Sequence, residues 1–458
     1  MNYKKHNYFG REKELKILNE KYRSKTFEFI TISGKSGDGK TALIKEFVEE
    51  KRAILFKAIR SNASHNYSAL SKSISKAMYS RLRSLVNFND MSDALDFVIK
   101  MAEKERIVLV IDDYDNLFHS VKDISIVMRE YISRMFSGKN IMLILTGPEK
   151  FLSEQKFGKV PTSLVLKKLS FSEVKPHFRN RYSDEDLLML YGITGGNPEY
   201  VNYIDSGKSI QDNIESLFLD SAGPMYTVPI LKATTDMRNP EVYDSIMYAV
   251  STGTPKIREI MELSDIQSSA TCSTYLSNLI DLGIIVKMLP FNEKTIRNGR
   301  YGLTDLSLRF WYAVVHENQS LIEYKSEDNL YPALVEHKFE GFIEDVFRAV
   351  CIQFIEENKG FFNMIPGRSG PWWNNKDSID HIVESQDGMS TMFCECRYHD
   401  SLVGMSVLKS LIRRSKSVEV FGTRRYALFS KTGFTDELHE YSERNDITLV
   451  TLRDMCWL

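Results

Sequence analysis

The chain has 458 residues and a formal net charge of −1, so charge alone gives it no overall attraction to nucleic acids or membrane surfaces. Hydrophobic residues make up 43% and charged residues 26%, which is typical of a globular protein, and the length corresponds to roughly three domains. The N-terminus lacks a signal core, no apolar run is long enough to span a bilayer, and the five scattered cysteines form no C-x-x-C pair. We therefore expect a cytoplasmic protein without a membrane contact, a disulfide framework or a structural zinc site.

The first segment, residues 1–165, alternates strand and helix patterns, which predicts a parallel sheet with helices on both faces. Apolar runs at 27–33, 53–56, 107–111 and 141–145 fit buried strands. Helical patterns occupy 67–86, 92–103 and 123–136.

The eight residues at 34–41 match G-x-x-x-x-G-K-[ST] in full and stand between a predicted strand and a predicted helix. Their glycines let the backbone N–H groups wrap phosphates, and the helix N-terminus adds partial positive charge. Lys40 would reach the β- and γ-phosphates, and Thr41 would hold Mg²⁺. The alternative is a Gly-rich turn that fits by chance, but strand, loop and helix together favour the phosphate loop. The candidate loop is Gly34, Lys35, Ser36, Gly37, Asp38, Gly39, Lys40 and Thr41.

Acidic residues follow the apolar run at 107–111, and a parallel sheet presents such residues at its carboxyl edge, where ligands bind. Asp112 would coordinate Mg²⁺, and Asp113 would orient or deprotonate the attacking water. Thr146 ends the next apolar run, and its hydroxyl would contact the γ-phosphate or the water. The alternatives are a polar loop after the first strand and a plain strand-ending turn after the second.

The segment Tyr8 to Leu15 resembles the h-x-G-R-E-x-E-L opening of AAA+- and STAND-related signalling ATPases, more narrowly the archaeal-type ATPases also found in bacteria. In that family the opening lies against the adenine, which implies a role for Phe9, Gly10 and Arg11. Asp112 and Asp113 resemble the acidic end of the family's Walker B strand. Many relatives have Glu at the position of Asp113, so the shorter side chain implies slow turnover.

Residues 166–225 are predicted to form a helical lid, with an N-cap pattern from Ser170 to Glu173 and a helix from Asp184 to Leu190. The sequence Gly195-Gly196-Asn197-Pro198 resembles the G-G-x-P element that packs its proline near the base in the same family. Pro198 is therefore a candidate adenine contact. A Gly-Gly turn followed by a helix that begins with proline explains the same residues without a ligand.

Residues 226–305 fit a winged-helix domain, with helices predicted at 243–250, 256–263 and 268–282 and a hairpin from strands at 284–288 and 300–303. The third helix carries polar residues that can hydrogen-bond to bases, but it has no Arg or Lys for phosphates. Both DNA binding and protein packing stay open for this domain.

The last segment, residues 306–458, begins with helices predicted at 306–324 and 339–355 and continues with strands at 378–383 and 391–398. It resembles the PD-(D/E)XK nuclease fold, which implies a metal site at Glu344, Asp380 and Glu395. Arg397 stands where that family has lysine, and arginine cannot serve as a base. An active nuclease is therefore disfavoured. An inactive domain, in which Arg397 pairs with Glu344 or Asp380, stays open.

Eight Lys and Arg against three acids between Phe393 and Lys431 form a candidate stripe for a polyanion such as DNA, or a solvated helix face. We expect an α/β protein: a P-loop NTPase sheet with a helical lid, then a winged-helix domain and a small α/β nuclease-like domain. Its function would be an ATP- and Mg²⁺-dependent switch with Lys40, Asp113 and Thr146 as catalytic residues, either alone or as a homo-oligomer. An ATP-gated DNA nuclease and a DNA-binding scaffold without turnover are the alternatives.

Overall fold

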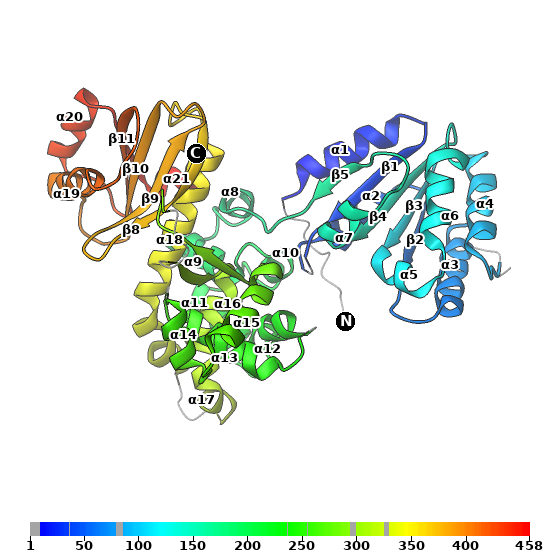
Figure 1. Cartoon of the computed structure of the whole chain (residues 1–458), viewed down its shortest axis with the longest axis horizontal. Coiled ribbons are helices and arrows are strands. Elements are labelled where there is room, and N and C mark those ends of the chain that lie inside the picture. The colour runs from blue at the N-terminus through cyan, green and yellow to red at the C-terminus, as the bar shows by residue number, and fades with distance from the viewer. Residues whose placement is uncertain are drawn as a thin grey trace. The chain divides into compact units, whose positions relative to one another are not determined.

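The apolar runs of the first segment form four strands of one parallel sheet, as the sequence predicts. A computed structural model describes residues 10–35, 37–78, 86–235, 237–253, 255–293, 299–324 and 329–458, with the backbone alone at 337–339. The chain divides into two units: unit 1 holds 1–169 and 197–199, and unit 2 holds 170–196 and 200–458 (Figure 1). The predicted lid, winged-helix and C-terminal segments therefore lie almost wholly in unit 2.

Unit 1 is a three-layer structure around a five-stranded parallel sheet of order β2-β3-β4-β1-β5. One face packs against α3 to α6 through residues such as Leu109 and Leu143, and the other against α1 and α2 through residues such as Ile30 and Val110. The elements are α1 (Glu12–Arg23), β1 (Glu28–Ser33), α2 (Lys40–Val48), β2 (Ala53–Lys57), α3 (Ala63–Met78), α4 (Met91–Ala102), β3 (Ile107–Asp112), α5 (Tyr114–Ser120), α6 (Ile124–Glu130), the π-helical turn η1 (Tyr131–Met135), β4 (Ile141–Gly147), α7 (Glu149–Glu154) and β5 (Thr162–Val165).

Unit 2 begins with helices that pack against the long helix α18, so that the predicted lid and the C-terminal segment share one core. The predicted helix at 306–324 is divided into α16, η4 and α17. The helical elements are α8 (Phe171–Val174), η2 (Lys175–His177), α9 (Asp184–Thr194), α10 (Pro198–Val201, whose first two residues belong to unit 1), α11 (Ile210–Phe218), α12 (Pro224–Thr234), α13 (Pro240–Ser251), α14 (Ile257–Leu263), α15 (Ser269–Asp281), α16 (Leu306–Val314), η4 (His316–Asn318), α17 (Gln319–Tyr324), η5 (Pro332–Glu336) and α18 (His337–Glu357).

Helices α13, α14 and α15 are followed by an antiparallel hairpin of β6 (Ile285–Met288) and β7 (Arg300–Leu303), close to the ranges expected for a winged helix. The helices pack against one another and against the hairpin. The order of elements therefore agrees with the prediction, whereas the winged-helix role of this segment stays a prediction.

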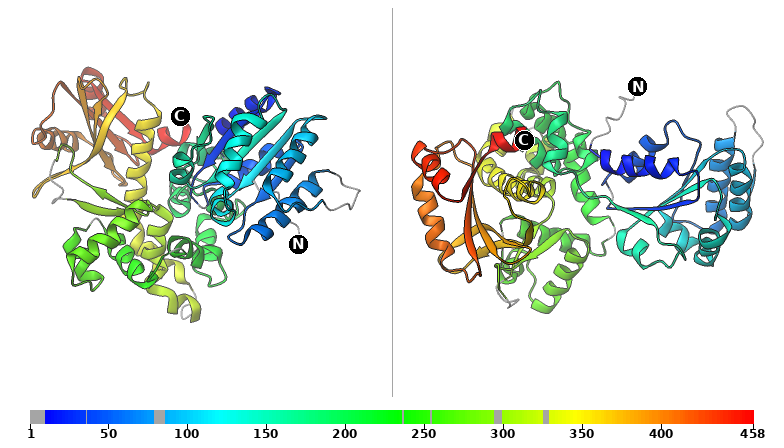
Figure 2. Two further views of the ribbon diagram at one scale, coloured as in Figure 1. Left: turned by 45° about the vertical axis from the view of Figure 1, so that its right-hand side comes forward. Right: turned by 90° about the horizontal axis from the view of Figure 1, so that it is seen from above.

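The C-terminal sheet has the order β12-β11-β10-β9-β8, in which β8 to β10 are antiparallel and β10 to β12 are parallel. Helix α18 lies on one face, and α19 and α20 lie on the other (Figure 2). The elements are β8 (Pro366–Trp373), β9 (Ser378–Ser385), β10 (Ser390–Arg397), α19 (Met405–Ser415), β11 (Thr423–Ser430), α20 (Asp436–Arg444), β12 (Ile447–Thr451) and α21 (Leu452–Trp457). In the described ranges of both units, no helix combines the length and apolarity that crossing a bilayer requires.

Candidate nucleotide-binding site

The loop between β1 and α2 takes a conformation that its glycines make accessible. Gly34, Gly37 and Gly39 have φ values of +157°, +92° and +89°, a region that side chains with a Cβ rarely adopt. A Cβ on Gly34 would also lie 2.8 Å from the carbonyl oxygen of Leu166. Gly39 is the N-cap residue of α2, so the free N–H groups of that helix begin where the loop ends. The loop therefore has the backbone shape and the helix N-terminus that phosphate binding needs.

Lys40 and Asp38 hold the loop together through hydrogen bonds within it. The Lys40 Nζ donates hydrogen bonds to the carbonyl oxygens of Gly34 at 2.6 Å and Lys35 at 3.0 Å. The Asp38 carboxylate accepts from the Lys35 backbone N–H at 2.7 Å, and burial raises the pKa of this carboxyl above its ordinary value. The Lys40 ammonium thus lies inside the loop, where a phosphate could replace the carbonyl oxygens as its partner.

Arg11, in the opening segment of the chain, supports the phosphate loop through hydrogen bonds. Its side chain is 5% exposed and donates to the carbonyl oxygens of Asp38 at 3.2 Å and of Lys167. Gly10, also predicted to lie near the adenine, has a φ of +43° just before it. The observed role of Arg11 is thus to support the phosphate loop. Phe9 and Ser36, two further predicted ligands of the nucleotide, lie outside the described residues.

Three predicted site residues meet where β3, β4 and α2 come together. The Thr146 hydroxyl donates to Oδ1 of Asp112 at 2.5 Å, and the Thr41 hydroxyl donates to Oδ2 at 3.4 Å. Thr146 is fully buried and Asp112 is 8% exposed. The sheet explains this meeting, because β4 lies between β3 and β1, and β1 leads through the loop into α2. A hydroxyl and a carboxylate side by side are oxygen donors of the kind that Mg²⁺ prefers, so Thr41 and Asp112 fit such an ion.

Asp113, the predicted water-activating residue, follows β3 in the left-handed region, with φ and ψ both 54°. Its backbone N–H donates to the Thr146 hydroxyl at 2.9 Å, and its carboxylate pairs with the Lys57 ammonium at 3.3 Å. Lys57 stands opposite Asp112 in the register of β2 and β3. The sequence reasoning missed Lys57, because only the pairing of two strands brings it to this edge.

A third acid, Asp115, also lies at this edge and was not predicted. Its Oδ1 is 3.3 Å from the position that a Cβ on Gly147 would take, directly after Thr146. Burial raises the pKa of Asp115, and the nearby charge of Asp113 acts in the same direction. The available signal for this group was the close spacing of Asp112, Asp113 and Asp115, where β3 ends and α5 begins.

Pro198 belongs to unit 1 together with Asn197 and Glu199. Its Cγ lies 3.4 Å from the position of a Cβ on Gly39. The predicted adenine contact therefore lies beside the last glycine of the loop, although 159 residues separate the two in the sequence.

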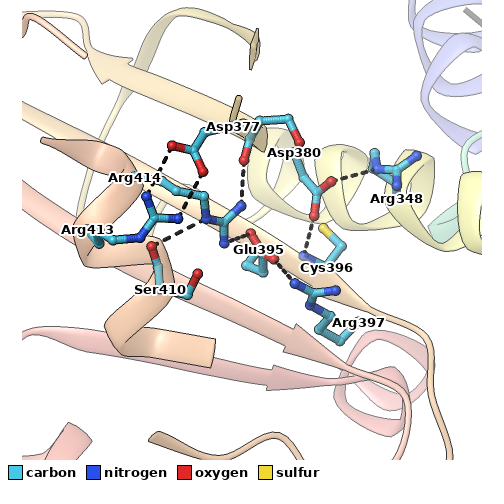
Figure 3. A network of polar contacts seen from close by, with 10 residues as sticks. Arg348, Asp377, Asp380, Glu395, Cys396, Arg397, Ser410, Arg413 and Arg414 are labelled. Atoms are coloured by element: carbon cyan, nitrogen blue, oxygen red, sulfur yellow. Dashed lines mark hydrogen bonds and ion pairs between the residues drawn. The ribbon is translucent and has the colours of Figure 1, made fainter. Parts of the chain in front are cut away.

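The predicted second metal site has a different arrangement, in which arginines hold the acids (Figure 3). Asp380 accepts from Arg348 Nε at 3.1 Å and from the Cys396 backbone N–H at 2.8 Å. Glu395 is 3% exposed and pairs with Arg414 at 2.8 Å and with Arg397. Burial raises the pKa of Glu395, whereas the two arginines act in the opposite direction.

The third predicted ligand, Glu344, lies on α18, but the side chain of this helix that contacts Asp380 is Arg348. Arg348 also pairs with Asp345 at 2.7 Å. Among the residues that the structure describes, no group of three or more His, Cys, Asp or Glu side chains is placed to hold a metal ion. The prediction that Arg397 pairs with Glu344 or Asp380 differs from the structure, where its partner is Glu395.

Most side chains of the predicted basic stripe already have hydrogen-bond or ion-pair partners within the protein. Arg414 is buried, and Arg413 pairs with Asp377 at 2.9 Å. Lys409 and Lys416 are exposed. The internally bonded members are Arg397, Arg413, Arg414, Arg424, Arg425 and Lys431.

Comparisons with known proteins agree with the loop and the sheet. Residues 8–204 match a family model described as an ATPase domain predominantly from Archaea, and residues 311–410 match a model for archaeal and bacterial proteins of unknown function. The uncharacterized protein MJECL04 of Methanocaldococcus jannaschii is 26% identical over 469 residues, which cover 98% of this chain and 99% of that protein. Residues 8–204 are thus similar to a P-loop ATPase domain of the archaeal type.

Two solved structures have a distant likeness to about two thirds of the chain. The Walker-type ATPase PABY2304 of Pyrococcus abyssi is 16% identical, with a TM-score of 0.49 and coverage of 68% of this chain and 97% of that one. The ORC2 protein of Aeropyrum pernix, solved as ADPNP and ADP complexes, is 12% identical, with a TM-score of 0.45 and coverage of 70% and 96%.

Proposed function

We propose that the protein is an ATP-binding and ATP-hydrolysing switch, in which the nucleotide state of unit 1 acts on unit 2. The observation that carries the proposal is the meeting of Thr41, Asp112 and Thr146 beside the phosphate loop. In such a site the loop N–H groups and Lys40 bind the phosphates. Thr41 and Asp112 hold Mg²⁺, which supplies charge neutralisation to the phosphates when bound.

The hydrolytic step in this proposal belongs to Asp113 and Thr146. Asp113 accepts a proton from the attacking water, and the Thr146 hydroxyl positions that water or the γ-phosphate. The Lys57 ammonium lies 3.3 Å from one oxygen of the Asp113 carboxylate, so Lys57 competes with the attacking water for this carboxylate. This competition, together with the short side chain of Asp113, supports a slow ATPase rather than a fast one.

The coupling to unit 2 is supported by the connection of the lid helices to the C-terminal domain. The Lys431 ammonium pairs with Glu185 of α9 at 2.9 Å, and the Trp457 indole N–H donates to Asp184 at 3.1 Å. Lys175 donates to the carbonyl oxygen of Met455 at 2.7 Å. Pro198 lies beside the loop in unit 1, and the chain enters unit 2 again at residue 200. A nucleotide that moves Pro198 would therefore pull on a body that includes the whole C-terminal half.

Nucleotide binding is tested by calorimetry with ATP, and with GTP as the competing base, in the presence of Mg²⁺. Lys40→Ala should weaken binding about ten- to hundredfold, because a charge-assisted hydrogen bond to phosphate is lost. Lys45→Ala is the matched control, since Lys45 is exposed on the same helix. Equal nucleotide affinities of the two variants, or no binding heat with either nucleotide, would contradict the proposal.

Turnover is tested by phosphate release from ATP. Asp113→Asn should keep binding and lower the rate about hundredfold or more, which is the usual contribution of a general base. No turnover in the wild type, with binding intact, would favour the scaffold that holds nucleotide without hydrolysing it.

The second candidate function, an ATP-gated DNA nuclease, is disfavoured by the arginines that hold Asp380 and Glu395. In our proposal this domain is nuclease-like in descent and does not cut. Wild-type protein should leave plasmid intact in Mg²⁺ and Mn²⁺, with and without ATP. Cleavage by the wild type that Asp380→Ala abolishes would establish the nuclease instead. Cleavage by Arg397→Lys alone would identify a disabled nuclease.

A further inference from the structure

A polar groove of about 400 Å³ lies in unit 2, beside the β6–β7 hairpin and the first strand of the C-terminal sheet. Its lining includes Lys256 at the start of α14, Arg300 of β7, and Trp372 and Trp373 of β8. The nucleotide-binding site uses none of these residues. The groove is therefore an independent feature of the molecule.

The walls of the groove are joined by hydrogen bonds to main-chain carbonyl oxygens. The backbone N–H of Phe291 donates to the carbonyl oxygen of Pro371 at 2.8 Å, and the Asn292 side chain donates to the carbonyl oxygen of Glu419 at 2.6 Å. The segment that follows β6 in the hairpin, the edge strand β8 and the segment that follows α19 are thus fixed to one another. The groove is preformed, which lowers the entropy cost of binding.

Planar groups dominate one part of the lining. The Arg300 guanidinium lies 4.7 Å from the centre of the Trp373 ring, and Trp373 is half-buried. Trp372 is 8% exposed and packs with Ile379 and Ile382 in the core of the sheet domain. Aromatic rings and guanidinium planes held in this way are the surfaces on which unpaired bases stack.

Side-chain amides supply hydrogen-bonding groups next to the planar ones. Asn374 accepts two backbone hydrogen bonds through Oδ1, from Lys376 at 2.7 Å and Asp377 at 2.8 Å, so its amide nitrogen is left to donate. Asn375 also lines the groove and is exposed. Amides of this kind both donate to and accept from the edges of bases.

The charges point to a base inside the groove and phosphates outside it. Among the described residues of the lining, Lys256 and Arg300 are balanced by Glu293 and Glu419, which leaves little net charge for a polyanion. The exposed residues Lys376 and Lys416 directly adjoin the lining residues Asn375 and Ser417 in the sequence. A near-neutral groove with lysines beside it suits a base and its flanking phosphates better than a free phosphate.

We infer that this groove binds an unpaired base of a single-stranded nucleic acid, with Trp373 and Arg300 as the stacking surface. A base in a duplex is stacked and paired, so it has no free face or edge for these groups. DNA and RNA single strands share this chemistry, and binding assays with both decide between them.

The inference is tested by fluorescence anisotropy of the full chain with short labelled oligo(dT) and oligo(U), and with a duplex of the same length. We expect single strands to bind and the duplex to compete poorly. Trp373→Ala should weaken binding about tenfold, because one stacked base is lost. Tyr324→Ala is the control, since Tyr324 is an aromatic residue of unit 2 that is 79% exposed and lies outside the groove.

Two further variants keep the outcome clear if Trp373→Ala unfolds. Trp373→Phe retains a ring and should bind within a few-fold of the wild type, whereas Asn375→Asp places a negative charge in an exposed loop and should weaken binding several-fold. The inference fails if no single strand binds, if the duplex binds as tightly, or if Asn375→Asp and Tyr324→Ala have equal affinity. A free mononucleotide that competes as well as the strand would also overturn it.

Discussion

At the scale of single residues, the burial of His381 makes the stability of the fold depend on pH. It is 6% exposed, its Nδ1 has no hydrogen-bond partner among the described residues, and burial lowers its pKa to about 4 although the nearby Asp380 charge opposes this. It lines a cavity of about 240 Å³ with Glu356 and Lys359. The imidazole is therefore neutral in the folded protein throughout the range in which an unfolded histidine gains its proton.

This shift predicts that unit 2 loses stability in acid. Between pH 6.5 and 4 the unfolded chain binds the proton and the folded chain does not. The free energy of unfolding therefore falls by about 3 kcal/mol in total as the pH is lowered through this range. His381→Gln should lack this part of the loss. Urea unfolding followed by tryptophan fluorescence measures it, because all four tryptophans belong to unit 2.

The exposed residue His399 provides the control for this prediction. His399→Gln should keep the wild-type dependence on pH, since this variant leaves the buried His381 in place. Other titrating groups contribute equally to all three proteins, so only the differences between them count. Identical slopes for the wild type and His381→Gln would contradict the assignment.

The residues of the nucleotide site and of the C-terminal acidic cluster differ in how far the sequence could predict them. The loop at 34–41 was predictable because its spacing is local, and Asp112 and Thr146 were predictable because strand ends meet at one edge. Lys57 was not, because its place opposite Asp112 depends on the register of β2 and β3. Arg348 was missed for a similar reason: the helical phase of α18 against the sheet decides which side chain reaches Asp380.

At the scale of elements, the packing of α9 against α18 leaves no room for a side chain at Gly192. A Cβ there would lie 2.7 Å from Cγ2 of Val346 and 3.0 Å from the ring of Phe342. Gly192→Ala should therefore lower the free energy of unfolding of unit 2 by about 1–3 kcal/mol, the usual cost of overpacking. Urea unfolding followed by tryptophan fluorescence is again the measurement.

Gly341, on α18, serves as the matched control, because no atom in the described part of the chain lies within 4 Å of a Cβ placed there. Gly341→Ala should raise the free energy of unfolding by up to about 1 kcal/mol, since alanine loses less backbone freedom in a helix than glycine. The same substitution thus has opposite signs at two positions. A gain in stability from Gly192→Ala would show that the two helices are not closely packed.

Two of the strands that the sequence did not predict, β5 and β8, lack an apolar signal. Strands β1, β3 and β4 are buried along most or all of their length and read as apolar runs, whereas β5 contains Thr and Ser and is half exposed. Strand β8 holds two prolines and two glycines at the edge of its sheet. Edge strands tolerate such residues because only one side of the strand must form a ladder of hydrogen bonds. The composition of these two strands is therefore similar to that of a loop, and the sequence alone does not reveal them.

At the scale of the whole molecule, the lid helices belong to unit 2 by their contacts. Gln353 of α18 accepts from the Phe171 backbone N–H at 2.9 Å and donates to the Tyr191 hydroxyl at 2.8 Å. Together with the Lys431 and Trp457 contacts, these bonds join α8, α9, α18, α21 and the residue that follows β11. A lid that moved alone would break all of them, at a cost of several kcal/mol in hydrogen bonds and packing.

We therefore predict that ATP moves unit 2 as one body relative to unit 1. Fluorescence energy transfer between dyes at Glu20→Cys in unit 1 and Ser277→Cys in unit 2 should change with a non-hydrolysed ATP analogue, and should not change in a Lys40→Ala background. Dyes at Arg181→Cys and Glu437→Cys, both exposed and both within unit 2, should give the same transfer with and without the analogue. Four of the five native cysteines are buried, so Cys396→Ser is the one background change that selective labelling needs.

A change in the second pair would mean that the lid separates from the C-terminal sheet. An unchanged first pair, in protein that binds the analogue, would mean that the nucleotide does not move unit 2.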